Sequence, residues 1–363
     1  MDNLTHLALG AAIGQVAAYR RLGRAALVLG AIGNTLPDLD VVGNALGSLA
    51  EWQHHRGLTH SLFFGPVLGP IFGYGVWRAY RRWRPASPCA GPASLGPIMA
   101  VLTLALIAHP LLDLFTVYGT QLLAPCSSAR FSIPGVSIID PIYTLILLAG
   151  IVPGVMKRRP AIASAALALV LSTGFLFYCW EQNQRAEAEA RRQLAATGQR
   201  AADLRAYTTI FQPWLRRLVM VEEERVRVGF LSTWRPGPIL WACVKRPDDK
   251  LIERARATPE AEILTRFADG QIWPGLRRDE QGRTIVRFTD LRYGVPGPTA
   301  TGWWGIDVSL GTNGEVLSAL RIAVPRPPLS WGTVAAVYRA GLGDLAEFYA
   351  VTGAPMEPAA SGC

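Results

Sequence analysis

The chain has 363 residues, of which 17% are charged, and its mean hydropathy is +0.22. Its net charge of +9 does not by itself indicate a nucleic-acid partner, because much of the basic charge of the first half lies in short clusters between apolar stretches. Five scattered cysteines without a C-x-x-C pair indicate neither a thiolate zinc site nor a disulfide framework, so single thiols are expected.

Apolar stretches of membrane-spanning length occur in the first half. Four of them have roughly the ~20 residues that a helix needs to cross the hydrocarbon core: 61–77, 95–117, 138–156 and 160–180. Two shorter stretches, 4–19 and 24–37, are interrupted by glycine and polar residues, so tilted, re-entrant or protein-packed helices are expected there. The start MDNLTH lacks the positive charge of a secretory signal peptide and is expected to be retained. Residues 1–180 are therefore predicted to form a multi-span α-helical transmembrane bundle.

Three basic clusters between these stretches predict the topology, because the positive-inside rule places them in the cytoplasm. They are Arg20/Arg21/Arg24, Arg78/Arg81/Arg82/Arg84 and Lys157/Arg158/Arg159. This orientation places the histidines and most aspartates of the first half at the outer ends of their helices. It also predicts that the part after residue 180 lies outside the cytoplasm.

Glycines at helical spacing predict close helix packing that would bring these outer ends together. They are Gly10/Gly14 and Gly65/Gly69/Gly73, and such faces let membrane helices approach one another. The alternative is that these glycines are merely tolerated, since glycine is common in membrane spans.

His109 and Asp113 are four residues apart on an apolar helix, so their side chains share a face and can bind one ion. Pro110 between them removes a backbone hydrogen bond and predicts a kink, as is found where membrane helices open around a site. The alternative is a His–Asp pair that only satisfies a buried interface. Because ionisable groups inside spans are costly, the functional interpretation is preferred.

Two further segments supply metal-ligand residue types. Leu36-Pro37-Asp38-Leu39-Asp40 presents two carboxylates, which would be ordinary cap or loop aspartates if no histidines followed. The segment 54–61, HHRGLTHS, then places three imidazoles before a membrane helix. The predicted metal ligands are His6, Asp38, Asp40, His55, His60, His109 and Asp113. Binding is expected to depend above all on Asp38, His60, His109 and Asp113, whose three segments meet at the outer ends.

Imidazole and carboxylate ligands suit a divalent metal, with zinc expected first and manganese or iron(II) as alternatives. A metal ion lowers the pKa of bound water, and Asp40 or Asp140 is predicted to be the catalytic base. Arg56 is predicted to clamp a phosphoryl or carboxylate oxygen, although a headgroup-facing arginine fits nearly as well.

The second half has a different composition. Residues 181–207 are rich in Ala, Glu, Arg and Gln and predict an exposed connecting helix. Residues 208–363 contain β-branched and aromatic runs broken by turn residues, which predict a soluble α+β domain with an antiparallel sheet. This domain contains no histidine, so a metal site is not expected in it. Its run Glu222/Glu223/Glu224 is predicted to be a hairpin turn.

Taken together, these motifs resemble the YdjM-type family of membrane-bound metal-dependent hydrolases, also described as LexA-binding and inner-membrane-associated. The resemblance rests on His6, 37–40 (PDLD), 55–61 (HRGLTHS), 109–113 (HPLLD), 118–120 (YGT) and 139–141 (IDP), and it continues weakly through 267–270 (FADG) and 289–294 (TDLRYG). It implies a multi-pass protein of the bacterial inner membrane. More distantly, the order of His6, Asp38, a histidine of the His55/His60 pair and the His109-x-x-x-Asp113 unit is similar to that of zinc-dependent phospholipase C and single-strand nucleases. This chain lacks their later His-x-x-x-Glu pair, so one or two ions are expected rather than three.

The leading hypothesis is a hydrolase that acts on a phosphoester or lipid-linked substrate at the outer membrane face, in contact with membrane lipid. The alternative is a metal-stabilised scaffold or regulator that binds a protein partner through its C-terminal domain. A nucleic-acid or DNA-bound-repressor partner requires a cytoplasmic C-terminal domain, and the predicted topology argues against it.

Overall fold

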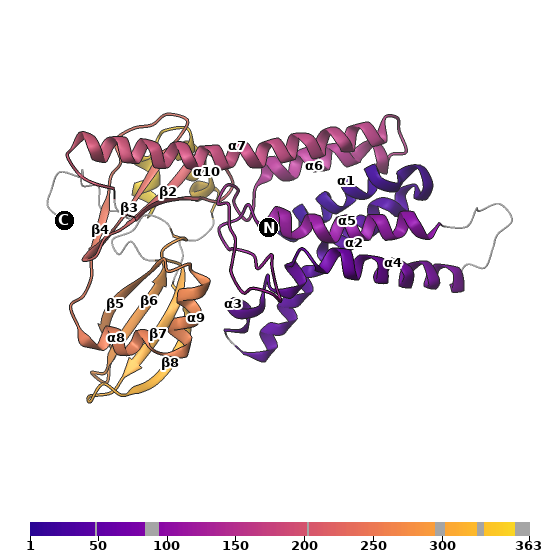
Figure 1. The fold of residues 1–363 in the computed structure, drawn as a ribbon. Helices are drawn as coiled ribbons and strands as arrows, with labels where there is room; N and C mark the ends of the chain where they lie inside the picture. The colour runs from indigo at the N-terminus through magenta and orange to yellow at the C-terminus, as the bar shows by residue number, and fades with distance from the viewer. Residues whose placement is uncertain (48, 84–93, 202, 295–301, 325–329, 353–363) are drawn as a thin grey trace. The chain divides into compact units, whose positions relative to one another are not determined.

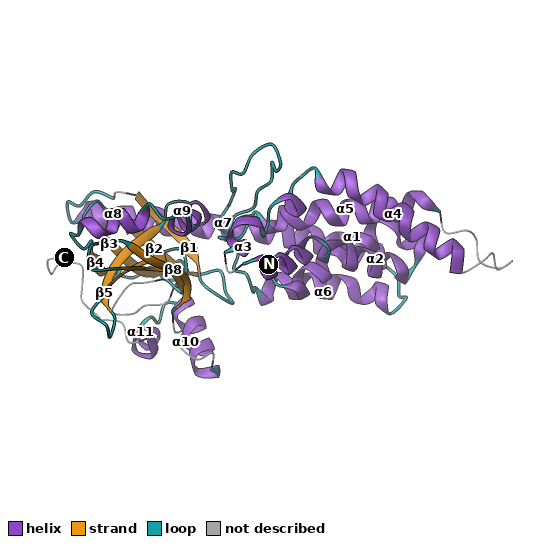
Figure 2. Ribbon diagram, turned by 90° about the horizontal axis from the view of Figure 1, so that it is seen from below, coloured by secondary structure: helices purple, strands orange, loops and turns teal. Residues whose placement is uncertain are grey.

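The computed structural model describes the chain except for residues 48, 84–93, 202, 295–301, 325–329 and 353–363. The chain divides into two compact units (Figure 1). The first comprises Met1–Gly43 and His54–Tyr178, and the second comprises Asn44–Gln53 and Cys179–Cys363. Figure 2 shows that the first unit is helical and that the sheets belong to the second. The predicted fold class, a helical membrane bundle followed by an α+β domain with antiparallel sheet, is confirmed.

The first unit is mainly helical, and residues 114–140 form a long connection without a helix. Its α-helices are α1 (Asn3–Leu22), α2 (Arg24–Thr35), α4 (Phe64–Trp83), α5 (Leu95–Asp113), α6 (Pro141–Val155) and the first part of α7 (Ala161–Ala196). Two 3-10 helices, η1 (Pro37–Leu46) and η2 (Leu58–His60), begin in it, and the short helix α3 (Ala50–His54) lies between them in the chain.

Among the described residues, three helical stretches are long and apolar enough to cross a membrane: Arg24–Val42, Leu95–Asp113 and Ala161–Ala196. The stretch predicted at 138–156 forms α6, a shorter apolar helix of 15 residues. The stretches at 4–19 and 61–77 form α1 and α4, which have 20 residues each but do not meet the hydropathy and charge criteria of a candidate span.

Glycines bring pairs of helices into backbone contact, which confirms the prediction of close packing. A Cβ atom added to Gly10 would lie 2.1 Å from the carbonyl oxygen of Gly30 on the neighbouring helix α2. The three glycines of α4 lie against α5 in register, Gly65 against Ile107, Gly69 against Thr103 and Gly73 against Met99. Because a side chain at these positions would collide with backbone or Cβ atoms, only glycine permits this approach.

Helix α7 continues for 36 residues from the apolar bundle into the second unit. The sequence predicted that its polar part is exposed, and this is wrong for one face. Ala186, Ala190 and Leu194, spaced four residues apart, are buried in a hydrophobic cluster with the first sheet and Trp241. Alanine is small enough to let the helix lie close to a sheet, so a stripe that looks weakly apolar in sequence can still form a core.

The second unit contains two four-stranded antiparallel sheets rather than one. The first has the order β1 (Asp203–Thr208), β2 (Leu215–Val221), β3 (Arg225–Ser232), β4 (Ala242–Lys245). The second has the order β5 (Ile272–Arg278), β6 (Thr284–Asp290), β7 (Trp304–Leu310), β8 (Val316–Ala323). The helices are α8 (Lys250–Arg256), α9 (Pro259–Phe267), α10 (Trp331–Gly341) and α11 (Ala346–Thr352).

Two smaller expectations can be checked in this unit. The acidic run beginning at Glu222 forms the turn between β2 and β3, as predicted, and Glu222 pairs with Arg225 and Arg227. The expectation of single thiols holds for Cys126 and Cys179 but is wrong for Cys243, which is disulfide-bonded.

Candidate metal centre

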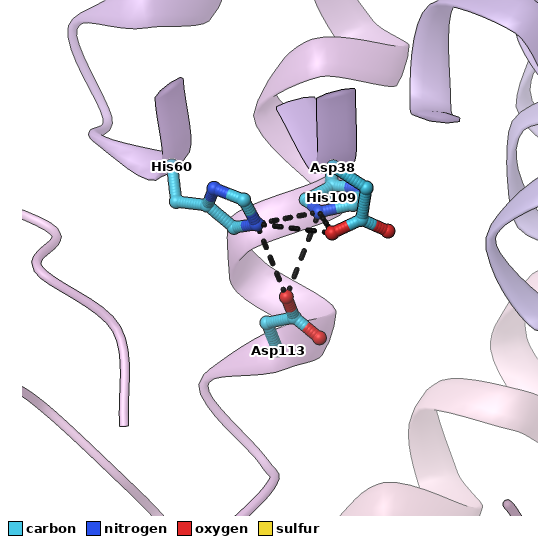
Figure 3. A group of neighbouring side chains, drawn as sticks. All are labelled: Asp38, His60, His109 and Asp113. Atoms are coloured by element: carbon cyan, nitrogen blue, oxygen red, sulfur yellow. Dashed lines mark hydrogen bonds and ion pairs between the residues drawn. The ribbon is translucent and has the colours of Figure 1, made fainter. Parts of the chain in front are cut away.

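Four side chains from three segments of the first unit converge on one point (Figure 3). Asp38 lies in the first turn of η1, His60 ends η2, and His109 and Asp113 occupy the last turns of α5. Each offers one ligand atom, and these atoms all lie within 4.8 Å of one another. The structure thus brings together the four residues on which the sequence predicted metal binding to depend.

Local sequence explains how each segment reaches this point. Pro37 cannot continue α2, so the chain leaves that helix and enters η1, where Asp38 follows at once. A Cβ atom at Gly57 would lie 2.7 Å from the His54 carbonyl oxygen, so glycine allows the tight turn that precedes His60. Pro110 lies within α5, which nevertheless continues to Asp113.

The distances match the coordination of a single cation. His60 Nε2 and His109 Nε2 are 2.9 Å apart, and Asp38 Oδ1 lies 3.5 and 3.4 Å from them, respectively. Asp113 Oδ2 is 3.5 Å from both nitrogens. Ligand atoms bound to a tetrahedral zinc ion at its usual bond lengths are separated by roughly 3.3 Å. The four atoms therefore surround a space of the right size for a metal ion.

Burial makes this arrangement costly without a cation. The side chains of His60, His109 and Asp113 are fully buried, whereas Asp38 is 17% exposed. Asp113 Oδ2, the oxygen that faces the two imidazoles, has no hydrogen-bond partner among the residues that the structure describes. A buried carboxylate oxygen without a partner is unfavourable, and a bound cation would satisfy it.

Asn34 on α2 orients His109. His109 Nδ1–H donates a hydrogen bond of 2.5 Å to the Asn34 carbonyl oxygen, so the lone pair of the neutral ring lies on Nε2, which faces the cluster. The Asn34 side chain donates to the carbonyl oxygen of Ala105 (2.8 Å) and accepts from His6 Nδ1 (3.0 Å). Such outer contacts fix the ring orientation of metal-binding histidines. Sequence reasoning missed this role, although a polar residue inside an apolar stretch was its visible signal.

Asp40 and His55, which the sequence predicted as ligands, lie on the far side of His60. His60 Nδ1 is 3.0 Å from Thr59 Oγ1, which itself donates to Asp40 Oδ2 at 2.8 Å, and Asp40 Oδ2 is 3.4 Å from His60 Nδ1. Asp40 Oδ1 is 2.6 Å from His55 Nδ1. Both residues thus support His60 from behind rather than joining the four converging atoms.

The second oxygen of Asp113 is held by other groups. Arg56 Nη2 lies 3.0 Å from Asp113 Oδ1, the Met1 amino group also contacts this oxygen, and His6 Nε2 is 3.4 Å away. The His6 ring stacks on His109 with ring centroids 3.8 Å apart. The Arg56 guanidinium on Oδ1 leaves Oδ2 directed toward His60 and His109.

Comparison with known proteins assigns the first half of the chain. Residues 1–186, about half of the sequence, match the family described as YdjM inner membrane protein. The chain belongs to this family. The uncharacterised protein YfhP of Bacillus subtilis (strain 168) is 25% identical over 181 residues, which are 47% of this chain and 51% of YfhP. The chain thus spans about half the length of this curated relative. No solved structure shows a significant match.

The YdjM match and the candidate spans together identify a membrane protein of an inner-membrane family. All four converging residues, and the groups that hold them, lie within the matched region. The weaker resemblance of 267–270 and 289–294 lies outside it.

The residues predicted to be catalytic are placed differently from the ligands. Asp140 is the N-cap of α6, where its carboxylate accepts a hydrogen bond from the Tyr143 backbone N–H at 3.0 Å. The Arg56 guanidinium is buried and contacts Asp113 and Thr116. Arg56 thus holds a converging carboxylate, and its contacts in the structure do not leave it exposed to a substrate.

His60 lies before α4, outside the candidate spans, and its protonation is strongly perturbed. Burial lowers the pKa of His60, but the attraction of the Asp113, Asp38 and Asp40 carboxylates, which lie 3.4–3.5 Å from its ring nitrogens, outweighs burial and raises the pKa to about 9. In the metal-free protein at neutral pH, His60 therefore carries a proton on each nitrogen. Its Nε2–H can then donate to His109 Nε2, at the place where a metal ion would bind both nitrogens.

Proposed function

We propose that this YdjM-family protein is a membrane-bound metal-dependent hydrolase that uses zinc and acts on a phosphoester or lipid-linked substrate. The observation that supports the proposal is the convergence of two imidazole nitrogens and two carboxylate oxygens at metal-ligand spacing. This ligand set without a thiolate suits zinc first, and manganese or iron(II) next.

When bound, the ion would polarise the scissile group and lower the pKa of a bound water molecule. Three buried ligands, His60, His109 and Asp113, would hold it from the interior. Asp38 is partly exposed, so water and substrate would approach from its side. Asn34 and Thr59 would keep the two imidazoles in the tautomers that present Nε2.

The proton of the attacking water needs an acceptor that is not a ligand. Asp40 and His55 form a partly exposed pair beside His60, with side chains 10% and 13% exposed. In this proposal Asp40 holds the His55 ring through Nδ1, and the pair, which lies behind His60, acts as the general base through an intervening water molecule. Asp140, the other predicted base, caps α6 through Oδ1, and this proposal prefers the Asp40–His55 pair.

The substrate class follows from location and from the chemistry of the cluster. A cation held at the end of an apolar helix is suited to bind a phosphate group close to lipid. We place the site at the outer face of the inner membrane, because the basic clusters between the helices favour the cytoplasm for the opposite helix ends.

One observation favours a second candidate function. Four protein ligands fill a tetrahedral ion, as in structural zinc sites, whereas catalytic sites keep a position open for water. A metal-stabilised scaffold or regulator, which binds a protein partner through the C-terminal domain, is the alternative. Catalysis would need a position open to water, and Asp38, the partly exposed member of the four residues, is the one that could leave it free.

Detergent-purified protein, stripped with a chelator and reloaded with Zn²⁺, Mn²⁺ or Fe²⁺, tests both functions. Hydrolysis of bis(p-nitrophenyl) phosphate and of phosphatidic acid in mixed micelles is measured for the wild type, His60→Ala and His54→Ala. His54 is exposed and lies outside the cluster, so it is the matched control. We expect turnover that requires metal and is lost only in His60→Ala. Metal-dependent stabilisation without turnover of either substrate would refute hydrolysis of these phosphoesters and support the scaffold.

A further inference from the structure

The segment between the two ligand-bearing turns belongs to the other unit of the molecule. Asp38 precedes it and His60 follows it, yet Asn44–Gln53 is part of the compact unit formed by the C-terminal half. The chain therefore leaves the first unit after Gly43, belongs to the second unit over Asn44–Gln53, and returns to the first unit at His54. Nothing in the proposed chemistry explains this excursion.

Two neighbouring residues of α3 attach the segment to the second unit. Trp52 is 3% exposed, and its ring stacks on Phe267 with centroids 5.5 Å apart and planes inclined by 12°. The guanidinium group of Arg321, on β8, lies over the Trp52 ring, with its Cζ 4.6 Å from the ring centroid. Its Nη1 also pairs with Glu51 Oε2 at 2.8 Å. One arginine thus binds both neighbours, by a cation–π contact and by an ion pair.

The surface that receives Trp52 is itself firmly held. Phe267 ends α9 and is 2% exposed, and the Arg292 guanidinium lies 4.7 Å from its ring centroid. Arg292 is fixed by a buried ion pair with Asp290, at 2.8 Å between Nη2 and Oδ2. Phe267, Asp290 and Arg292 belong to 267–270 and 289–294, the two segments of the second half that the sequence singled out.

We propose that Glu51 and Trp52 are positioning residues, through which the C-terminal unit sets the geometry of the metal centre. Residues 39–59 separate Asp38 from His60 along the chain, and holding 44–53 at Trp52 shortens the part that is free to move. Fewer conformations of this connection leave the two ligands closer to their binding positions before an ion arrives. The inference rests on the proposed metal centre and adds a role for the second unit in it.

Full-length protein titrated with Co²⁺ tests the inference, because the visible absorption of bound Co²⁺ reports both affinity and coordination geometry. We expect Trp52→Ala and Arg321→Ala to raise the Kd for Co²⁺ by about tenfold, as loss of a supporting contact does. Their absorption bands should also shift. Trp52→Phe and Arg321→Lys, which keep the stacked ring or the cation, should restore both properties.

Arg287→Ala is the matched control. Arg287 lies in the same sheet as Arg321, has a similar exposure of 30% against 29%, and pairs with Asp307. If Arg287→Ala weakened Co²⁺ binding as much as Arg321→Ala, general loosening of the domain would explain the effect and the inference would be wrong. Unchanged Co²⁺ binding in folded Trp52→Ala and Arg321→Ala would also overturn it. A wild type that binds no Co²⁺ would instead refute the metal centre itself.

Discussion

The substitution Asp40→Asn tests whether the Asp40 carboxylate supports His60 or binds the metal ion directly. The Asp40 carboxylate accepts hydrogen bonds from the Arg56 backbone N–H (3.1 Å) and Thr59 Oγ1 (2.8 Å), and it lies 3.4 Å from His60 Nδ1. Its other oxygen is 2.6 Å from His55 Nδ1. An asparagine can keep its oxygen toward Arg56 and Thr59, but its NH2 group would then face His55 Nδ1, and the negative charge behind His60 would be lost.

The expected effect follows from this position. Loss of an outer contact to a metal-binding histidine weakens metal binding by about 10–100-fold, which corresponds to roughly 1.4–2.8 kcal/mol. Removal of a ligand in His109→Ala should have a larger effect and abolish stoichiometric binding. Asp40→Asn should therefore retain a metal ion at saturating concentration but release it to a chelator sooner than the wild type.

Competition between the purified protein and a chromophoric chelator for Zn²⁺ measures the difference, with His54→Ala as the neutral control. Circular dichroism of each variant shows whether its fold is retained. An unchanged Kd for folded Asp40→Asn would refute the view that Asp40 supports His60. A loss as complete as that in His109→Ala would instead make Asp40 a direct ligand, as the sequence predicted.

Three further outcomes are expected. Gly10→Ala should lower the melting temperature in detergent, because the added Cβ would lie 2.1 Å from the Gly30 carbonyl oxygen and overpacking costs about 1–3 kcal/mol. Gly75→Ala is the control and should leave the melting temperature unchanged, because a Cβ there has no neighbour within 4 Å. Equal melting temperatures for the two variants would contradict the packing. The pKa of His60 is raised from 6.5 in the unfolded chain to about 9 in the folded, metal-free protein. Protonation of His60 therefore stabilises the metal-free fold fully below pH 6.5, and this stabilisation is lost as the pH rises through 9. Zn²⁺ must displace that proton, so affinity should rise between pH 6.5 and 9, and calorimetry in buffers of different ionisation enthalpy should detect proton release; binding independent of pH would refute this. A reporter active only in the cytoplasm and fused after Cys363 should stay dark, whereas a bright signal would reverse the predicted topology of the last span.

Several features followed from the sequence because they depend on local geometry. The rise of a helix sets the length of apolar segment that spans a membrane, and α5 was predicted from that rule. The helical repeat places His109 and Asp113 on one face whatever surrounds them. The glycine spacing on α4 likewise predicted a close helix contact, because a face without side chains lets any neighbouring helix approach; in the structure that helix is α5.

Other features depended on contacts between distant segments. His54, His55 and His60 are equivalent as residue types, and only the turn at Gly57 and the hydrogen bonds around Asp40 direct His60 toward the cluster. The same holds for Asp38 against Asp40, which lie two residues apart but face opposite sides of the His60 ring.

The largest departures from expectation have the same physical origin. Asn34 anchors His109 from another helix, the alanine face of α7 is buried because a sheet lies against it, and Trp52 belongs to the second unit because Phe267 receives its ring. Residue type and spacing determined which groups are available for binding a metal. Tertiary packing decided which of their atoms converge, because side-chain direction in turns and 3-10 segments is set by long-range hydrogen bonds rather than by a repeat along the chain.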